Sequence, residues 1–130
     1  MNKQKLVVVG AGGMVGATAA YACALRSVVE EIVLIDRNPD LAWGQAADIT
    51  DGMGIDRCVV VRSGDYDDIK TDDIVVITAG APQQPGQTRL ELLGVNAEIM
   101  RGTVRNIMRN GARPYILVVS NPVDALTYVA

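Results

Sequence analysis

A cluster of glycines and one aspartate near the start of the chain have the types and spacing that bind a dinucleotide. The glycines follow directly on an apolar run and are Gly10, Gly12, Gly13 and Gly16, and Asp36 ends the next apolar run. Glycines allow a sharp turn and let the backbone approach a pyrophosphate, whose charge is attracted by free N–H groups at a helix start. A carboxylate after the second strand can accept both hydroxyls of an adenosine ribose and would repel a 2′-phosphate. The pattern favours NAD over NADP, and a glycine-rich turn in another α/β protein is the alternative.

An arginine after a loop rich in glycine, proline and glutamine is a second candidate. The loop spans residues 79–87, and Arg89 then opens a long helix. The helix dipole disfavours a cation at this end. An arginine kept there could polarise a substrate carbonyl once the loop closes and excludes water. A solvated side chain is the alternative.

Two predicted strand ends carry further candidates. Thr78, Ala79 and Gly80 end one apolar run, and small side chains there would let the chain lie against the ribose and pyrophosphate of a cofactor. A tight turn is the alternative. Asn121 follows another apolar run, where its amide could hold a nicotinamide or a substrate oxygen. A helix N-cap or an Asx turn is the simpler role for this asparagine.

These residues lie between apolar runs and helical patterns that alternate along the chain. Strands are predicted at 6–9, 32–35, 58–61, 74–78 and 116–119. Helices are predicted at 13–26, 41–49, 89–110 and from 123 onward, and Asn38 and Pro39 suit the start of the second one. The polar segment 64–72 is too short and too broken for a full crossover helix. Trp43 is expected to pack at the edge of an apolar helix face.

Alternating strands and helices predict an α/β fold with a doubly wound parallel sheet. We expect the strand order 3-2-1-4-5 with helices on both faces, and a ligand crevice at the carboxyl ends of strands 1 and 4. Gly10, Asp36, Thr78 and Ser120 all lie at the ends of predicted strands. The fold would therefore bring them to one crevice.

Composition narrows the class of protein. The 130 residues suit one domain (1–130), and a net charge of −3 without a basic block argues against binding to nucleic acid or to an anionic membrane. No apolar stretch approaches a membrane span, and the first strand begins too close to Met1 for a signal peptide, so we expect a cytoplasmic protein. Cys23 and Cys58 lack a CxxC partner and the chain has no histidine, so we expect two buried free thiols and no metal site.

Taken together, five features of the chain closely resemble the L-lactate and malate dehydrogenase family. In order they are GAGGMVG, Asp36, VVITAGAP, QQPGQTRLELLGVN and VVSNPVD, and the resemblance extends over residues 5–130. It implies NAD as the cofactor and a hydride transfer between its nicotinamide and a small 2-hydroxy or 2-oxo acid. The cofactor-binding residues that it implies are Gly10, Gly12, Gly13, Met14, Val15, Gly16, Asp36, Thr78, Ala79, Gly80, Asn96, Val119 and Asn121.

The resemblance also implies three substrate-binding residues. Arg89 is similar to the family's catalytic loop arginine, which polarises the substrate carbonyl, and Asn121 to a residue that contacts substrate and nicotinamide. Gln83, six positions before Arg89, falls on the family's specificity position. Glutamine there is similar to lactate dehydrogenase, because a neutral amide tolerates the methyl group of pyruvate. Arginine there would be similar to malate dehydrogenase, because it pairs with a second carboxylate.

The chain departs from the family pattern in two ways. The usual turn is GxGxxG, whereas this turn is one residue longer and, read as GxxGxxG over Gly10, Gly13 and Gly16, is similar to many malate dehydrogenases. The turn and Gln83 thus indicate different branches, and we follow Gln83 because it would touch the substrate. The family's proton-transfer histidine, its partner aspartate and its carboxylate-binding arginine lie in a second half that this chain lacks.

We therefore expect the NAD-binding half of a lactate-type dehydrogenase, which binds NAD without turnover. The alternatives are a malate dehydrogenase cofactor domain and a stand-alone or engineered dinucleotide-binding module. A flavin or S-adenosylmethionine protein would leave the QxPGxTR and SNPVD motifs unexplained. Loss of a second domain would expose apolar surface, so we expect self-association into a dimer or larger assembly through helix 41–49, which resembles a family subunit interface.

Overall fold

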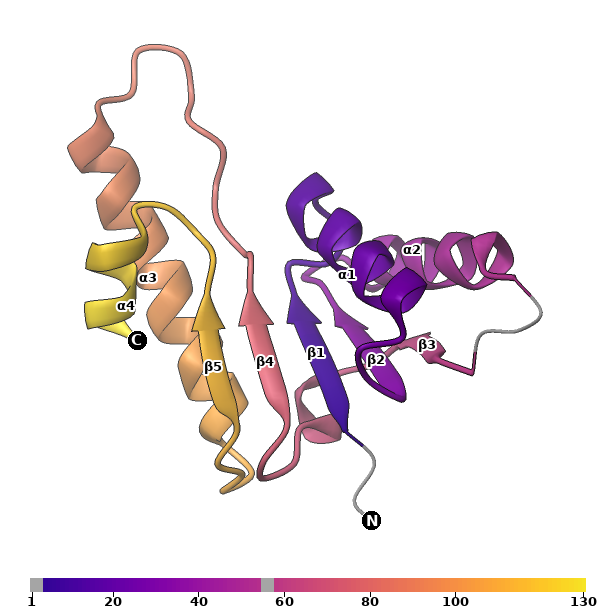
Figure 1. Ribbon diagram of the computed structural model, residues 1–130. Coiled ribbons are helices and arrows are strands. Elements are labelled where there is room, and N and C mark those ends of the chain that lie inside the picture. The colour runs from indigo at the N-terminus through magenta and orange to yellow at the C-terminus, as the bar shows by residue number, and fades with distance from the viewer. Residues whose placement is uncertain (1–3, 55–57) are drawn as a thin grey trace.

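The structure, a computed structural model, describes residues 4–54 and 58–130 and contains one parallel sheet of five strands in the order β3-β2-β1-β4-β5 (Figure 1). The strands are β1 (Lys5–Val9), β2 (Glu31–Ile35), β3 (Val60–Ser63), β4 (Ile74–Ile77) and β5 (Tyr115–Val118). The helices are α1 (Met14–Arg26), α2 (Pro39–Gly52), α3 (Arg89–Met108), α4 (Val123–Val129) and a short 3-10 helix at Tyr66–Asp68. The predicted strand order and doubly wound architecture are confirmed.

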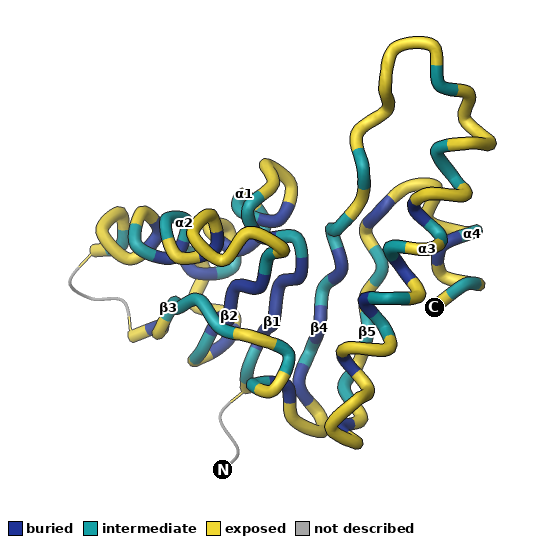
Figure 2. The backbone as a smooth tube through the Cα atoms, turned by 180° about the vertical axis from the view of Figure 1, so that it is seen from behind, coloured by how far each residue is buried: buried dark blue, intermediate teal, exposed yellow. Residues whose placement is uncertain are grey.

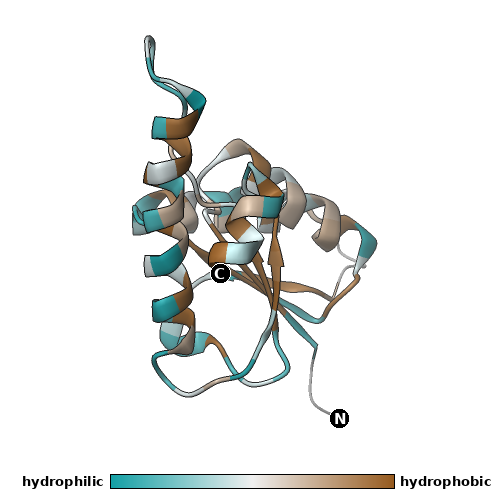
Figure 3. Cartoon of the chain, turned by 90° about the vertical axis from the view of Figure 1, so that its left-hand side faces the viewer, coloured by the Kyte–Doolittle hydropathy of each residue, from teal (hydrophilic) through white to brown (hydrophobic). Residues whose placement is uncertain are grey.

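Two apolar cores cover opposite faces of the sheet because successive strand residues point to opposite sides. On one face Leu6 and Val8 of β1 pack with α1 and α2 through small residues such as Ala20 and Ala46. On the other face the alternate residues of the same strands pack with α3 and α4 around Met100. Figure 2 shows nearly continuous burial along β1 and β2, whereas buried and half-buried residues alternate along β4. Figure 3 shows α3 with alternating hydrophilic and hydrophobic patches, as expected of a helix with one buried stripe.

Helices α2 and α3 begin at residues whose side chains accept backbone N–H groups. Asn38 accepts from the Asp40 N–H at 3.1 Å with Pro39 at the first position, as predicted. Thr88 accepts from the Glu91 N–H at 3.2 Å while the Glu91 carboxylate accepts from the Thr88 N–H at 2.8 Å. This reciprocal capping box was missed in the sequence, although threonine followed three residues later by glutamate is its signature.

Three local predictions need correction. Strand β3 runs over Val60–Ser63, two residues later than expected, because its register is set by pairing with β2 rather than by the apolar run. Cys58 is exposed and Cys23 half-buried, so both thiols are free but not both buried. Trp43, which was expected to pack at the edge of the apolar face of α2, leaves 67% of its surface exposed.

Ion pairs fix the amino ends of the strands, opposite the predicted crevice. Lys5 Nζ lies 3.0 Å from Asp73 Oδ2, with both side chains about nine-tenths buried, and joins the start of β1 to the turn before β4. Arg62 of β3 contacts Glu31 of β2 and Asp68, each at 2.8 Å. The hydrogen bond from Arg62 and the backbone N–H of Asp65 hold the pKa of Asp68 below its usual value. None of the helices in 4–54 and 58–130 is long and apolar enough to cross a membrane.

The Asp68 carboxylate predicts a dependence of stability on pH. A lowered pKa in the folded state stabilises the fold above the ordinary carboxyl pKa of about 4, and this contribution is lost as the pH falls through the folded-state value. Asp68→Asn should lower the free energy of unfolding by at most about 1 kcal/mol at neutral pH, since the pair is partly exposed. Urea titrations of both proteins should show the difference shrinking in acid.

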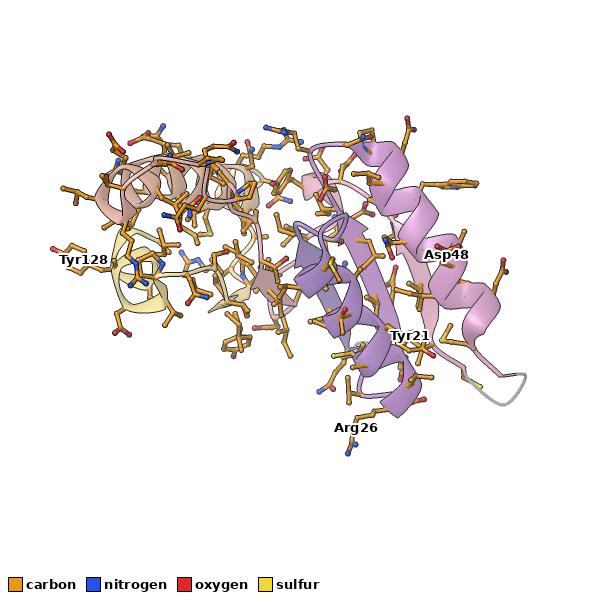
Figure 4. The ribbon with its side chains drawn as sticks, turned by 90° about the horizontal axis from the view of Figure 1, so that it is seen from above. Tyr21, Arg26, Asp48 and Tyr128 are labelled. Atoms are coloured by element: carbon orange, nitrogen blue, oxygen red, sulfur yellow. The ribbon has the colours of Figure 1, made fainter. Side chains whose placement is uncertain are left out.

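The control for this experiment is Asp48→Asn, on the exposed side of α2 (Figure 4). The Asp48 carboxylate has no hydrogen bond or ion pair among the described residues. Its substitution should leave the pH profile unchanged. An Asp68→Asn difference that stays constant from neutral pH into acid would contradict the prediction.

Candidate functional site

The carboxyl ends of β1, β2 and β4 meet at the glycine turn. The backbone N–H groups of Gly10 and Ala11 both donate to the Ile35 carbonyl at the end of β2, at 2.9 and 3.1 Å. The Thr78 N–H donates to Val9 at 2.9 Å, and the Thr78 hydroxyl lies within hydrogen-bond distance of the carbonyls of both Val9 and Gly10. The turn is therefore tied to a strand on each side.

Three of the four glycines are required by close packing. A Cβ on Gly10, whose φ is +89°, would lie 2.6 Å from the backbone nitrogen of Ala79. A Cβ on Gly16 would lie 2.5 Å from the Gly10 carbonyl oxygen, and one on Gly12 would lie 2.8 Å from Leu41 Cβ. Gly13 has no neighbour closer than 3.4 Å. Close packing therefore requires glycine at Gly10, Gly12 and Gly16, which is the spacing GxGxxxG. The spacing GxxGxxG includes Gly13, where a side chain would meet no close neighbour.

Helix α1 starts at this turn without any acceptor of its own. Gly13 at its N-cap provides no side chain, and its first turn contains no acidic residue. By contrast, α2 and α3 each have a side-chain cap and an acid in the first turn. The side chains of Met14 and Val15 are 87% and 58% exposed. The first N–H groups of a helix lack intrahelical partners, so the start of α1 is left open to an external anion.

Asp36 lies beside the turn with acceptor capacity to spare. Its Oδ2 accepts from the Gly12 N–H at 2.8 Å and its Oδ1 from the Asn38 N–H at 2.9 Å. An ionised carboxylate can accept about four hydrogen bonds, so each oxygen can take one more donor. The carboxylate is thus oriented by the backbone and still able to bind a pair of hydroxyls.

The loops after β4 and β5 are held together by two polar side chains. The Ser120 hydroxyl donates to the Ala79 carbonyl at 2.7 Å. Asn96 of α3 is 5% exposed, and its Oδ1 accepts from the Ala81 N–H at 2.8 Å while its Nδ2 lies 3.5 Å from the Asn121 carbonyl. Sequence reasoning missed both contacts. The only available signals were a serine at the end of a strand and an asparagine on the apolar side of a helix.

The predicted residues thus divide into two groups. The fold brings one group to the strand ends, and its members are Gly10, Gly12, Gly13, Met14, Val15, Gly16, Asp36, Thr78, Ala79, Gly80, Asn96, Val119 and Asn121. Val119 is 43% exposed and the Asn121 side chain is exposed, so both remain accessible. Gln83 lies in the loop that projects beyond the sheet between β4 and α3, and Arg89 is the first residue of α3 directly after that loop (Figure 1). Among the described residues, the Arg89 guanidinium makes no ion pair or hydrogen bond.

The polar groups at the foot of this loop are also ordered. The N–H and hydroxyl of Thr88 both donate to the Glu91 carboxylate, which lowers the pKa of Glu91 below its usual value. Within 4–54 and 58–130, no three histidine, cysteine, aspartate or glutamate side chains gather as a metal site would require. Two concavities of about 380 and 580 Å³ lie at the amino ends of the strands. None of the candidate residues lines either of them.

The doubly wound sheet, the open start of α1 and the carboxylate at the end of β2 together define a dinucleotide-binding domain. Comparison with known proteins makes the assignment specific. A family model described as lactate/malate dehydrogenase, NAD binding domain, matches residues 4–130. The chain belongs to this family as its NAD-binding domain, and its cofactor is NAD.

Relatives from both branches of the family are similar to the chain. An L-lactate dehydrogenase 2 of Lactococcus lactis subsp. lactis is 48% identical over all of this chain, which spans 41% of that protein. A lactate dehydrogenase from a Medee basin deep-sea metagenome superposes with a TM-score of 0.92 at 46% identity, over 99% of this chain and 41% of the other. A malate dehydrogenase from Archaeoglobus fulgidus in complex with NADH gives 0.88 at 43% identity, over 97% and 43%. The chain thus spans about two fifths of the length of these relatives.

Replacement of Gly16 tests the steric account of the turn. Gly16→Ala should lower the free energy of unfolding by about 1–3 kcal/mol and weaken NADH binding, because its Cβ meets a backbone oxygen that cannot move alone. Gly13→Ala is the control for stability and should cost under about 1 kcal/mol, since its Cβ would come no closer than 3.4 Å to a neighbour and the remaining cost is that of a poorer N-cap. Chemical denaturation and NADH titration give both values. Equal losses in the two variants would refute the assignment of the critical glycines.

Proposed function

We propose that the chain is the cofactor half of an enzyme that transfers a hydride between NAD and the C2 carbon of lactate and pyruvate. The observation that carries the lactate assignment is Gln83, a neutral and exposed amide on the loop that leads to Arg89. A dicarboxylate substrate would find no cation at this position, whereas a methyl group leaves no charge unpaired. Malate and oxaloacetate are the second candidate, supported by the length of the glycine turn and by the likeness to malate dehydrogenases.

The cofactor residues act mainly through their backbone. Bound NAD supplies the nicotinamide carbon that accepts the hydride. The N–H groups of Met14, Val15 and Gly16 at the open start of α1 bind its pyrophosphate, and Gly10, Gly12 and Gly13 allow the approach. Asp36 accepts the ribose hydroxyls. Thr78, Ala79 and Gly80 line the cofactor site, as do Val119 and Asn96.

The substrate residues act when the loop covers the crevice. Arg89 is exposed and unpaired among the described residues, so its guanidinium is available to polarise the C2 carbonyl once the loop excludes water. Asn121 presents its amide to the substrate and the nicotinamide. Gln83 faces the substituent on C2 and selects its size and charge.

The chain by itself binds NAD and does not turn over. Reduction of a carbonyl needs a proton as well as a hydride, and the sequence contains no histidine to act as the acid. Residues 1–130 taken alone present the cofactor site without the cover of a substrate domain, so this segment should bind NADH more weakly than the intact enzyme. A stand-alone binding module is a third candidate function. It is supported if residues 1–130 bind NADH but addition of a substrate domain of the family restores no activity.

Self-association follows from the apolar side chains left at the surface. Leu41 and Trp43 of α2 are 49% and 67% exposed, and Tyr115 and Leu117 of β5 are 65% and 50% exposed. Burial of such exposed apolar surface against a second copy of the chain would be favourable. We propose a dimer or larger assembly in which α2 contributes to the interface, in a cytoplasmic protein.

Replacement of Asp36 tests the cofactor site. Asp36→Asn keeps the shape of the side chain but removes the charge, and the Kd for NADH should rise about 10- to 100-fold because two charge-assisted hydrogen bonds to ribose weaken. The preference for NADH over NADPH should shrink, since the 2′-phosphate is no longer repelled. Calorimetric titration measures both, with Asp48→Asn as the control. An unchanged Kd for NADH would overturn the role given to Asp36.

A chimera tests the substrate assignment. Residues 1–130 would replace the matching part of the Lactococcus lactis enzyme, and the product should reduce pyruvate in preference to oxaloacetate. Gln83→Arg in this chimera should shift the ratio of kcat/KM values toward oxaloacetate by about a hundredfold, because an arginine pairs the second carboxylate. The chain 1–130 alone is the inactive control. A chimera that binds NADH and prefers oxaloacetate without the substitution would replace lactate by malate as the function.

A further inference from the structure

Within the loop between β4 and α3, residues 82–87 have their own internal structure, and the hydrogen bonds described for them all involve Gln87. The Gln87 N–H donates to the Gln84 carbonyl at 3.0 Å, and Gln87 Oε1 accepts from the Gln84 N–H, also at 3.0 Å. The Gln87 carbonyl in turn accepts from Nε2 of Gln83 at 3.0 Å. One residue therefore closes a ring that includes the amide of Gln83.

The residues between Gln84 and Gln87 suit this closure. Pro85 occupies the second position of the turn and Gly86 the third, where φ is +80°. This is the arrangement of a type II turn, in which the third residue must adopt a positive φ. A Cβ on Gly86 would meet nothing within 4 Å, so the glycine is required by its backbone conformation and not by space.

The ring is separate from the body of the domain. On one side the backbone is attached at Ala81, whose N–H is held by Asn96, and on the other at the capping box of Thr88 and Glu91. The hydrogen bonds described for residues 82–87 all remain within the loop. Figure 1 shows this segment standing clear of the sheet and helices. It is thus a preformed unit on two attachment points, able to move without losing its internal bonds.

The ring decides what the Gln83 amide offers to a substrate. A primary amide has two donors on nitrogen and an acceptor oxygen, and a carbonyl partner can be satisfied only by the nitrogen. The bond to the Gln87 carbonyl therefore fixes the orientation of the Gln83 amide, with its nitrogen toward Gln87. An amide that already has a hydrogen-bond partner in the loop keeps that bond when it faces a methyl group. An amide without such a partner loses its hydrogen bonds to water and gains none in return.

We propose that Gln87 is a positioning residue, which sets the preference for 2-oxo acids with a small apolar substituent by holding Gln83 within the loop. The proposal deepens the lactate-type function given above and rests on it. Gln87 touches neither substrate nor cofactor in this role. It acts on the substrate through Gln83 and through the order of the turn.

Kinetics of the chimera test the role of Gln87. Gln87→Ala removes the side-chain acceptor for the Gln84 N–H but keeps the backbone carbonyl that accepts from Gln83, so it acts on Gln83 by loosening the turn. The value of kcat/KM for pyruvate should fall about three- to tenfold, mainly through KM, because the substrate must then order the loop. The preference for pyruvate over hydroxypyruvate should fall further, since a Gln83 amide in a loosened turn can exchange its bond to the Gln87 carbonyl for one to a hydroxyl. The Kd for NADH should not change. Gln84→Ala is the matched control, because only the backbone of Gln84 takes part in the ring.

Amide NMR of the chain 1–130 tests the ring without reference to activity. The Gln84 N–H and the side-chain amide of Gln83 should exchange slowly with solvent, should exchange faster in Gln87→Ala, and should be unaffected in Gln84→Ala. Gln87→Glu keeps an acceptor oxygen and should restore slow exchange at Gln84.

The outcomes separate the two proposals. A parent chimera that binds NADH but does not reduce pyruvate overturns the lactate function, and the role of Gln87 in it falls as well. A parent chimera that reduces pyruvate, with Gln87→Ala and Gln84→Ala alike in substrate preference, overturns the positioning role alone. Fast exchange at Gln83 and Gln84 in the unmodified chain would likewise overturn the positioning role.

Discussion

The close approach of two backbones at the ends of β1 and β4 is the constraint on which the site depends. Gly10 lies against Ala79, and Gly16 of α1 lies against Gly10, at separations that leave no room for a Cβ. These contacts bring the start of α1 directly over the end of β1. A single added methyl group would force the turn away from β4, and the N–H groups at the start of α1 would no longer face the strand ends.

The first turns of the three long helices, α1, α2 and α3, differ in how their free N–H groups are satisfied. Helices α2 and α3 satisfy their first N–H groups with Asn38 and with the pair Thr88 and Glu91, whereas α1 has neither a cap nor an acid. The missing partner at α1 is a destabilising feature of the isolated domain, since a side-chain cap contributes about 1 kcal/mol. In the function proposed above, a bound pyrophosphate would provide that partner.

The loops after β4 and β5 are organised by different means. Asn96 and Ser120 tie the loops after β4 and β5 to each other, and they do so from buried positions. Beyond these ties the chain continues into a loop whose hydrogen bonds are internal. A rigid base with a preformed but detached loop is suited to closing over a bound molecule, because little order has to be created when it closes.

The sequence by itself determined the class of fold, the order of strands and NAD as the cofactor. These follow from local patterns: apolar runs of strand length, glycines directly after a strand, and an acid at the end of the next strand. The sequence did not determine the boundaries of β3, the exposure of Trp43 and Cys58, or which glycines are sterically required. Those depend on distances between segments far apart in the chain, such as Gly12 against Leu41 or Asn96 against Ala81. A sequence pattern shows which residue types are present. Only the packed structure decides which atoms come too close for a side chain and which pairs form hydrogen bonds.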